Sequence, residues 1–352
     1  MTALTPPERS VGAEPGPNAL GGYARQALSP ATRRADGSHL RAWEAWCQAK
    51  DVIPAPAVPA LVANHLAELA GQRAYVTLTG RLSAIVQAHH LLRPPFDNRD
   101  RELRKTLQGI ARAHGTRPKR QAARLLTADI IKLAALCGGG ARGGGTLLGA
   151  RDRALILLGF AGAFRRAELV EIRGGDLRFG PRGLSMFLPR SKADQIGEGS
   201  LVHVAANPLA AHCPVAAVRA WLDAAGIRQG GVFRRITRSD ALGRQRLSAE
   251  SVRLILKERA WEAGYRGEEL DRSTPHSLRA GCITTLALAS VHERDIMKHS
   301  RHGSQAVMRS YIRAAATPEA FTSGAPSGGA RSHSAAQRRC ARCCTPSCCT
   351  PS

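Results

Sequence analysis

Hydrophobic residues recur with a helical period between residues 29 and 114, and prolines cut that pattern into separate segments. In the first segment Leu40, Trp43 and Cys47 share one face, and charged residues occupy the other. Three prolines between residues 51 and 59, and the pair Pro94–Pro95, interrupt the pattern, because proline is not tolerated inside a helix. Residues 29–114 are therefore predicted to form a small all-helical domain of four short helices without a strand.

The pattern changes in the second half of the chain. Residues 150–161 are strongly apolar and predict a buried helix, and Thr127 is predicted to cap a helix that runs to residue 136. Alternating runs at 176–179, 184–188 and 200–204 predict three strands. Helical periodicity returns at 214–225, 248–264, 278–289, 292–298 and 304–315. The expected fold is mainly α, with a second α+β domain at 127–315 that holds a small antiparallel three-stranded sheet.

The remaining segments lack this periodicity. Residues 1–28 are rich in Pro, Gly and Ala, and residues 316–352 are rich in Gly, Ser and Arg, so both are predicted to be disordered. Residues 115–126 are predicted to be a basic interdomain linker. The glycine run at 138–145 lacks the strand and the GK[ST] sequence of a phosphate-binding loop, so it is predicted to be a surface loop.

The chain carries a large positive charge. It has 51 Lys and Arg against 27 Asp and Glu, a formal net charge of +24. A GC-rich genome would explain the preference for Arg over Lys but not the shortage of acids, so a nucleic-acid partner is favoured. A basic cluster around the linker is either a solvated face or a set of phosphate contacts, and its position between two domains supports the second. Its members are Arg112, Arg117, Lys119, Arg120 and Arg124.

Other sequence features indicate the cellular compartment in which the protein is expected. No apolar signal segment begins the chain, and its longest apolar run, 154–164, is too short to cross a membrane, so a cytoplasmic protein without membrane contact is expected. The cysteines before residue 300 occur singly, which suits a reducing compartment. Cys340 and Cys343 have the spacing of a metal knuckle, but no second pair or histidine frames them, so no metal site is predicted.

The candidate chemistry centres on Tyr311. A phenol has a pKa of about 10 and becomes a useful nucleophile only where cations stabilise the charge on the electrophile and on the phenolate. Arg165 follows the apolar helix, and its guanidinium can give two parallel donors to a phosphate. Glu168, three residues on, could hold that guanidinium in place. Taken alone, the pair is better explained as a surface ion pair without a function.

Further candidates follow in chain order. Lys192 lies between two predicted strands, where it could protonate a leaving oxygen, although a lone turn lysine usually faces solvent. His276 and Arg279 share a helical face, so both could bind one phosphate; the simpler alternative is a capping histidine beside a surface arginine. His302 precedes Tyr311 by nine residues. As a set, these residues predict attack of Tyr311 on a phosphodiester.

These motifs resemble the tyrosine site-specific recombinases, the phage-type integrases. The matched stretches are Phe-Arg-Arg-Ala-Glu-Leu at 164–169, Ser-Lys-Ala-Asp-Gln at 191–195, Pro-His-Ser-Leu-Arg-Ala-Gly at 275–281 and Arg-Ser-Tyr-Ile-Arg at 309–313. The resemblance covers about residues 29–313. It implies a SAM-like core-binding domain at 29–114 and a recombinase catalytic domain at 127–315. It also implies action on double-stranded DNA without a cofactor, with a homotetramer on synapsed DNA.

The resemblance further implies roles in a cleavage step that forms a 3′-phosphotyrosyl intermediate. The implied phosphate ligands are Arg165, Arg279 and His302, with Glu168 in support. Tyr311 would attack, His276 would assist proton transfer, and Lys192 would protonate the departing 5′ oxygen.

Two positions complicate this match. Arg301 stands where the family commonly has glycine, and His299 competes with His302, which the nine-residue spacing to Tyr311 favours. Two alternatives to a mobile-element recombinase also stay open. One is a type IB topoisomerase-like enzyme, and the other is a non-catalytic DNA-binding remnant, which the unusual tail would suit. The two-domain layout and the tyrosine motif favour the recombinase.

Overall fold

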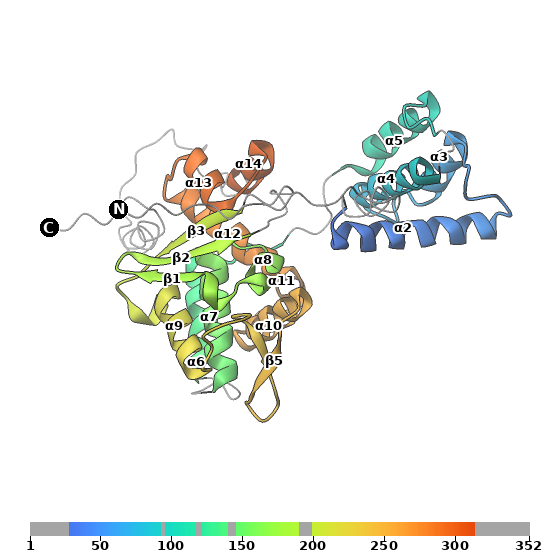
Figure 1. The fold of residues 1–352 in the computed structure, drawn as a ribbon. Helices are drawn as coiled ribbons and strands as arrows, with labels where there is room; N and C mark the ends of the chain where they lie inside the picture. Colours follow the sequence, from blue (N-terminus) through green and yellow to red (C-terminus); the bar gives the residue numbers. More distant parts are fainter. Residues whose placement is uncertain (1–27, 93–95, 117–121, 140–145, 190–198, 314–352) are drawn as a thin grey trace, which may run out of the picture. The chain divides into compact units, whose positions relative to one another are not determined.

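A computed structural model describes residues 28–92, 96–116, 122–139, 146–189 and 199–313. The chain divides into two compact units between Arg120 and Gln121 (Figure 1). Each unit has its own hydrophobic core.

The first unit consists of helices in its described residues, as predicted. They are α2 (Pro30–Ala49), α3 (Pro59–Glu68), α4 (Tyr75–Leu92) and α5 (Arg101–His114). The side chains of Ser29 and Asp100 cap α2 and α5 by accepting backbone N–H groups, and Pro30 and Pro59 occupy first-turn positions, where proline is tolerated. The pairs α2–α4 and α3–α5 pack around Trp43, which is buried.

The second unit contains most of the helices. These are α6 (Thr127–Gly139), α7 (Leu147–Ala161), α8 (Arg166–Glu171), α9 (Pro214–Ala224), α10 (Ala249–Glu262), α11 (Gly267–Arg272), α12 (Pro275–Leu288), α13 (Glu293–Ser300) and α14 (Gln305–Arg313). The described residues of this unit also form two short 3₁₀ turns, η1 (Gly174–Asp176) and η2 (Ala210–His212). The apolar helix α7 packs against α6, α9 and α12, so it is the predicted buried helix (Figure 1).

The predicted three-stranded antiparallel sheet is confirmed. Its order is β1 (Leu177–Gly180), β2 (Gly183–Leu188) and β3 (Ser200–Ala205). The register pairs Leu184 with Val204 on the buried face and Phe187 with Leu201 on the exposed face. This alternation is the period-2 pattern that predicted the strands.

A second hairpin was not predicted. Strands β4 (Arg234–Ile236) and β5 (Leu242–Arg246) pair antiparallel. Both are short and rich in arginine, so they lack the apolar alternation that marks a strand. The short helices α8 and α11 also escaped prediction, because six residues are too few to show a helical period.

The predicted cap at Thr127 is wrong. Thr127 is the first residue of α6, and its hydroxyl has no hydrogen-bond partner. The carboxylate of Asp129 instead accepts the backbone N–H of Leu126 at 2.8 Å. Just before it, Leu125 is buried in the core of the second unit, and its carbonyl lies so close to Gly281 that a side chain there would clash.

A buried ion cluster joins α7 to α10. Asp152 on α7 accepts hydrogen bonds from Arg259 Nε at 3.0 Å and Nη2 at 2.7 Å, and from Arg151 Nη2 at 2.6 Å. All three side chains are almost fully buried. The cluster fixes the helix whose C-terminal end leads to Arg165.

Candidate active site

Arg165 lies in the turn between α7 and α8. Ala163 in this turn has a φ of 46°, and Arg165 is the residue before α8. Glu168 accepts the backbone N–H of Arg165 at 3.0 Å and its Nη1 at 2.6 Å. Burial opposes ionisation of Glu168, but the guanidinium groups of Arg301 and Arg165 hold its pKa below the usual value. Arg165 is therefore held by an ionised carboxylate.

The first turn of α12 carries His276 and Arg279. Arg279 is 1% exposed, and its Nη1 donates to the carbonyl of Ala163 at 2.6 Å. Burial and the neighbouring cations lower the pKa of Arg279 to about 10, which leaves it protonated at neutral pH. Its Nη2 lies 3.2 Å from Nδ1 and 3.3 Å from Nε2 of His302.

The hydrogen bonds of Ser300 fix the tautomer of His302. The single hydroxyl proton of Ser300 is donated to the carbonyl of Ile296 at 2.6 Å. Its oxygen must then accept in the 2.7 Å contact with His302 Nδ1, so Nδ1 carries the ring proton and Nε2 carries the lone pair. Burial, with the charges of Arg279 and Arg165, lowers the pKa of His302 to about 3, which keeps the ring neutral.

Helix α14 places Tyr311 against His276. The phenol oxygen lies 2.6 Å from Nε2 of His276, and the Tyr311 ring also lies 5.7 Å from the ring of His302. Burial lowers the pKa of His276, and the charges of Arg279 and Arg165 lower it further, so the neutral imidazole can accept the phenol proton. Burial raises the pKa of Tyr311, and the same two charges oppose that rise.

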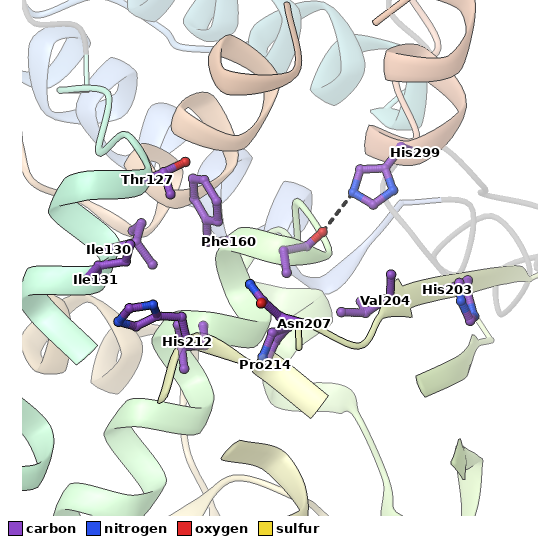
Figure 2. A pocket seen from close by; sticks show the side chains of 13 residues that line it. Thr127, Ile130, Ile131, Phe160, His203, Val204, Asn207, His212, Pro214 and His299 are labelled. Atoms are coloured by element: carbon purple, nitrogen blue, oxygen red, sulfur yellow. Dashed lines mark hydrogen bonds between the residues drawn. The ribbon is translucent and has the colours of Figure 1, made fainter. Parts of the chain in front are cut away.

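The structure brings the predicted catalytic and supporting residues that it describes into one cluster. They are Arg165, Glu168, His276, Arg279, His302 and Tyr311. Lys192 lies outside the described residues. Of the two competing histidines, His302 contacts Arg279, whereas Nε2 of His299 bonds to the carbonyl of Ala161 at 2.8 Å (Figure 2).

Similarity to known proteins agrees with this geometry. Residues 145–317 match the model of the phage integrase family. The chain is 37% identical over 272 residues to the integrase/recombinase xerD homolog of Selenomonas ruminantium, and the match covers 76% of each protein. The chain belongs to the phage integrase family.

Solved structures of similar fold include other integrases and recombinases. The Tn1549 transposon integrase in complex with transposon right end DNA has a TM-score of 0.56 at 14% identity, covering 83% of this chain and 92% of that chain. The XerH recombinase bound to palindromic difH substrate has a TM-score of 0.53 at 16% identity, covering 76% of this chain and 71% of that chain. At such identities the likeness shows the fold, which is mainly helical with small antiparallel sheets.

Sequence reasoning missed Ser300 and undervalued Arg301. Ser300 is fully buried and sets the tautomer of His302, but one serine beside a histidine gives no signal in a sequence. Arg301 was noted only as a departure from glycine. In the structure its φ is 56° and its Nη2 donates to Glu168 Oε2 at 2.9 Å. A helix end just before His302 could have signalled a left-handed residue at this position.

The predicted DNA-contacting cations are only partly described. Arg112 is exposed in the last turn of α5, in the first unit. Arg124 is half-buried in the second unit. Arg117, Lys119 and Arg120 lie outside the described residues.

A largely apolar pocket lies next to α13, with His299 in its lining (Figure 2). Ile130 of α6, Phe160 of α7 and Val204 of β3 contribute to its walls. The residues lining the pocket include no Asp, Glu, Lys or Arg. It therefore lacks the fixed charge that phosphoryl transfer needs, which leaves the cationic cluster around Tyr311 as the candidate site.

Within the described residues, no group of three His, Cys, Asp or Glu side chains is arranged to hold a metal ion. Cys340 and Cys343 lie outside that part of the chain. None of the described helices is long and apolar enough to span a membrane.

Proposed function

We propose that this protein is a site-specific DNA recombinase of a mobile element, an integrase that cleaves and rejoins DNA strands through a 3′-phosphotyrosyl intermediate. The observation that carries the proposal is the 2.6 Å contact between the Tyr311 hydroxyl and Nε2 of a neutral His276. Arg165 and Arg279 lie close enough to act electrostatically on both groups. A phosphodiester suits such a site, because phosphoryl transfer depends mainly on positioning and on stabilising charge on the phosphate oxygens.

In the cleavage step the Tyr311 oxygen attacks phosphorus while its proton passes to Nε2 of His276. The new O–P bond replaces the bond to the 5′ oxygen, which leaves with a proton that the family resemblance assigns to Lys192. Rejoining reverses these steps, with a 5′ hydroxyl from another strand as nucleophile. The phosphotyrosine conserves the energy of the broken bond, so the reaction requires no nucleotide cofactor.

Arg165 and Arg279 supply the phosphate clamp. Arg165 is held by Glu168, and Arg279 is held by the carbonyl of Ala163. Their orientation is thus set before the substrate arrives, which lowers the entropic cost of reaching the transition state. A planar guanidinium can give two parallel hydrogen bonds to phosphate oxygens, and it stays charged at neutral pH.

The family resemblance makes His302 a phosphate ligand, and this role requires a proton on Nε2. The resting tautomer has a lone pair on Nε2, so it can only accept a hydrogen bond there. Burial is the main cause of the low pKa of His302, and the charges of Arg279 and Arg165 lower it further. The negative charge of a phosphate offsets the effect of those charges, and so acts in the direction that favours a proton on Nε2.

The net charge of the chain and its similarity to known recombinases support duplex DNA as the partner. The net charge of +24 favours a polyanion, with affinity that falls steeply with salt. The Tn1549 integrase and XerH structures are complexes of those proteins with their own DNA. A homotetramer on synapsed DNA is the assembly we propose, with Arg112, Arg117, Lys119, Arg120 and Arg124 contacting phosphates.

Two other functions make different predictions. A type IB topoisomerase-like enzyme would relax DNA without transferring strands between sites; the name of the relative, an integrase/recombinase, favours strand transfer. A non-catalytic remnant would bind DNA without cleaving it. The cluster retains a nucleophile, a base and a clamp, which favours the enzyme.

A suicide substrate tests the proposal. A duplex that carries the element's end sequence, nicked near the cleavage point, should trap a denaturation-resistant protein–DNA adduct with the wild type and none with Tyr311→Phe. A folded, DNA-binding wild type that forms no adduct would refute the enzyme in favour of the remnant. An adduct accompanied by relaxation, but without strand transfer between two sites, would indicate a topoisomerase.

A further inference from the structure

Arg301 occupies a backbone conformation that suits glycine. It follows the last residue of α13 with φ 56° and ψ 46°, in the left-handed region where a Cβ is crowded. Its backbone N–H closes the helix by bonding to the carbonyl of Lys298 at 3.3 Å. Glycine would end the helix in the same way at lower conformational cost. The backbone therefore gives no reason for an arginine at this position.

The side chain supplies the reason. It is 8% exposed, and both terminal nitrogens of its guanidinium donate hydrogen bonds, whereas Nε is buried without a hydrogen-bond partner. Nη1 donates to the carbonyl of Gly162 at 3.1 Å, and Nη2 donates to the carbonyls of Gly162 at 3.1 Å and Ala163 at 3.2 Å. Nη2 also donates to Glu168 Oε2 at 2.9 Å, and the guanidinium lies 5.0 Å from the centre of the Phe164 ring. One side chain thus fixes the whole turn between α7 and α8.

The partners of Arg301 are the groups that hold the phosphate clamp. The second carboxylate oxygen of Glu168 accepts from Arg165 at 2.6 Å. The carbonyl of Ala163 accepts from Arg279 at 2.6 Å. The backbone carbonyl of Arg301 itself accepts from Arg165 Nη2 at 3.1 Å. Both arginines of the clamp therefore depend on atoms that Arg301 immobilises or provides.

We propose that Arg301 is a positioning residue for strand cleavage, whose guanidinium locks the turn between α7 and α8 together with Glu168, so that Arg165 and Arg279 meet the scissile phosphate in a fixed orientation. This inference rests on the proposed function, because Arg301 performs no chemistry of its own. Misplacing a catalytic group by about 1 Å can cost on the order of 10²-fold in rate. Arg301 thus controls the rate of cleavage rather than the affinity for DNA.

The test compares Arg301→Gly with Ser290→Gly. Arg301→Gly removes the guanidinium and relieves the backbone. Ser290 is another non-glycine residue in the left-handed region, with φ 60°, so Ser290→Gly relieves the backbone without touching the clamp. Arg301→Gly should form the covalent adduct about 10²-fold more slowly in a single turnover. Its DNA affinity should change by no more than about threefold, because the lost interaction acts on the transition state. Ser290→Gly should cleave at the wild-type rate.

Chemical rescue separates positioning from a loss of stability. Guanidinium ion at millimolar concentration can bind the carbonyl and carboxylate acceptors that Arg301 leaves, so it should restore part of the rate of Arg301→Gly. Urea, which is neutral and of similar shape, should not. Arg301→Lys keeps the positive charge but loses the planar guanidinium, so it should also cleave slowly. If Arg301→Gly does not fold, the cleavage rate of Arg301→Lys tests the inference instead.

Three results would overturn the inference: wild-type rates in Arg301→Gly, wild-type rates in Arg301→Lys, or a folded Arg301→Gly that guanidinium does not rescue. If the wild type itself forms no adduct, it is the proposed function that fails. The two failures are therefore distinguishable.

Discussion

His276→Ala removes the group that we propose accepts the Tyr311 proton. Nε2 of His276 lies 2.6 Å from the phenol oxygen, and burial keeps the imidazole pKa below its usual value, so the ring is a neutral base at physiological pH. In the variant the phenol proton must pass to water or hydroxide. Burial raises the pKa of Tyr311 above 10, so very little phenolate exists at pH 7.

The expected size of the effect follows from these pKa directions. A positioned general base contributes about 10²- to 10⁴-fold, so cleavage by His276→Ala at pH 7 should fall by a factor in that range. The phenolate fraction of Tyr311 grows about tenfold per pH unit below its pKa, so the variant should recover about 100-fold between pH 7 and pH 9. Wild-type cleavage should be flat over this interval. It should decline only at a lower pH than an ordinary histidine with a pKa of about 6.5 would give, because burial lowers the pKa of His276.

The assay is single-turnover adduct formation on the nicked substrate over this pH range and somewhat beyond it at both ends. His212→Ala, which changes a half-buried histidine away from Tyr311, is the matched control and should follow the wild-type profile. A melting curve establishes that each variant is folded. If the pH profile of His276→Ala runs parallel to that of the wild type, His276 is not the base and the proton must leave by another route.

Three other predictions concern stability and DNA binding. Asp152→Asn leaves Arg259 buried without one of its carboxylate partners, a loss of about 3–5 kcal/mol that should lower the Tm of the second unit by about 6–20 °C in calorimetry. The control variant Glu171→Gln breaks the exposed ion pair with Arg246, and it should lower the Tm only slightly. The pKa of His302 is about 3 in the folded protein and about 6.5 in an unfolded chain, so the unfolded state binds more protons between these pH values. The free energy of unfolding should therefore fall as the pH drops from about 6.5 to 3. His302→Asn should flatten that slope in denaturant titrations. Arg112→Ala should weaken DNA binding at all sequences and reduce the slope of log affinity against log salt by about one; an unchanged slope would remove Arg112 from the interface.

Local patterns were enough to predict the helices of the first unit and the three-stranded sheet. Apolar residues such as Trp43 repeat with the helical period and are buried, and Leu184 and Val204 follow the period of two that a half-buried strand requires. The members of the candidate cluster could also be predicted from the sequence, because the types of residue determine which chemistry they can perform. Tyr311 needs nearby cations to act as a nucleophile, and Arg165 and Arg279 are candidates that the chain provides.

Contacts between residues far apart in the chain could not be predicted from such local patterns. The bond from Arg259 to Asp152 spans 107 residues, and the bond from Arg301 to Glu168 spans 133. No periodicity encodes either pair, because each depends on how two helices pack. The tautomer of His302 is similar, since it follows from where the single proton of Ser300 points.

The charge distribution of the cluster connects its stability to its function. Arg165 and Arg301 pair with the carboxylate of Glu168, and Arg279 lies close enough for the charges of all three to act on it. Among these described groups the cations therefore outnumber the acid. Burial lowers the pKa of Arg279 most, and repulsion from Arg165 and Arg301 lowers it further; both effects cost folding free energy. A phosphodiester brings the missing negative charge to the same place. The interactions that weaken the fold are therefore those that strengthen phosphate binding, and they act most strongly when charge accumulates on the phosphate oxygens in the transition state.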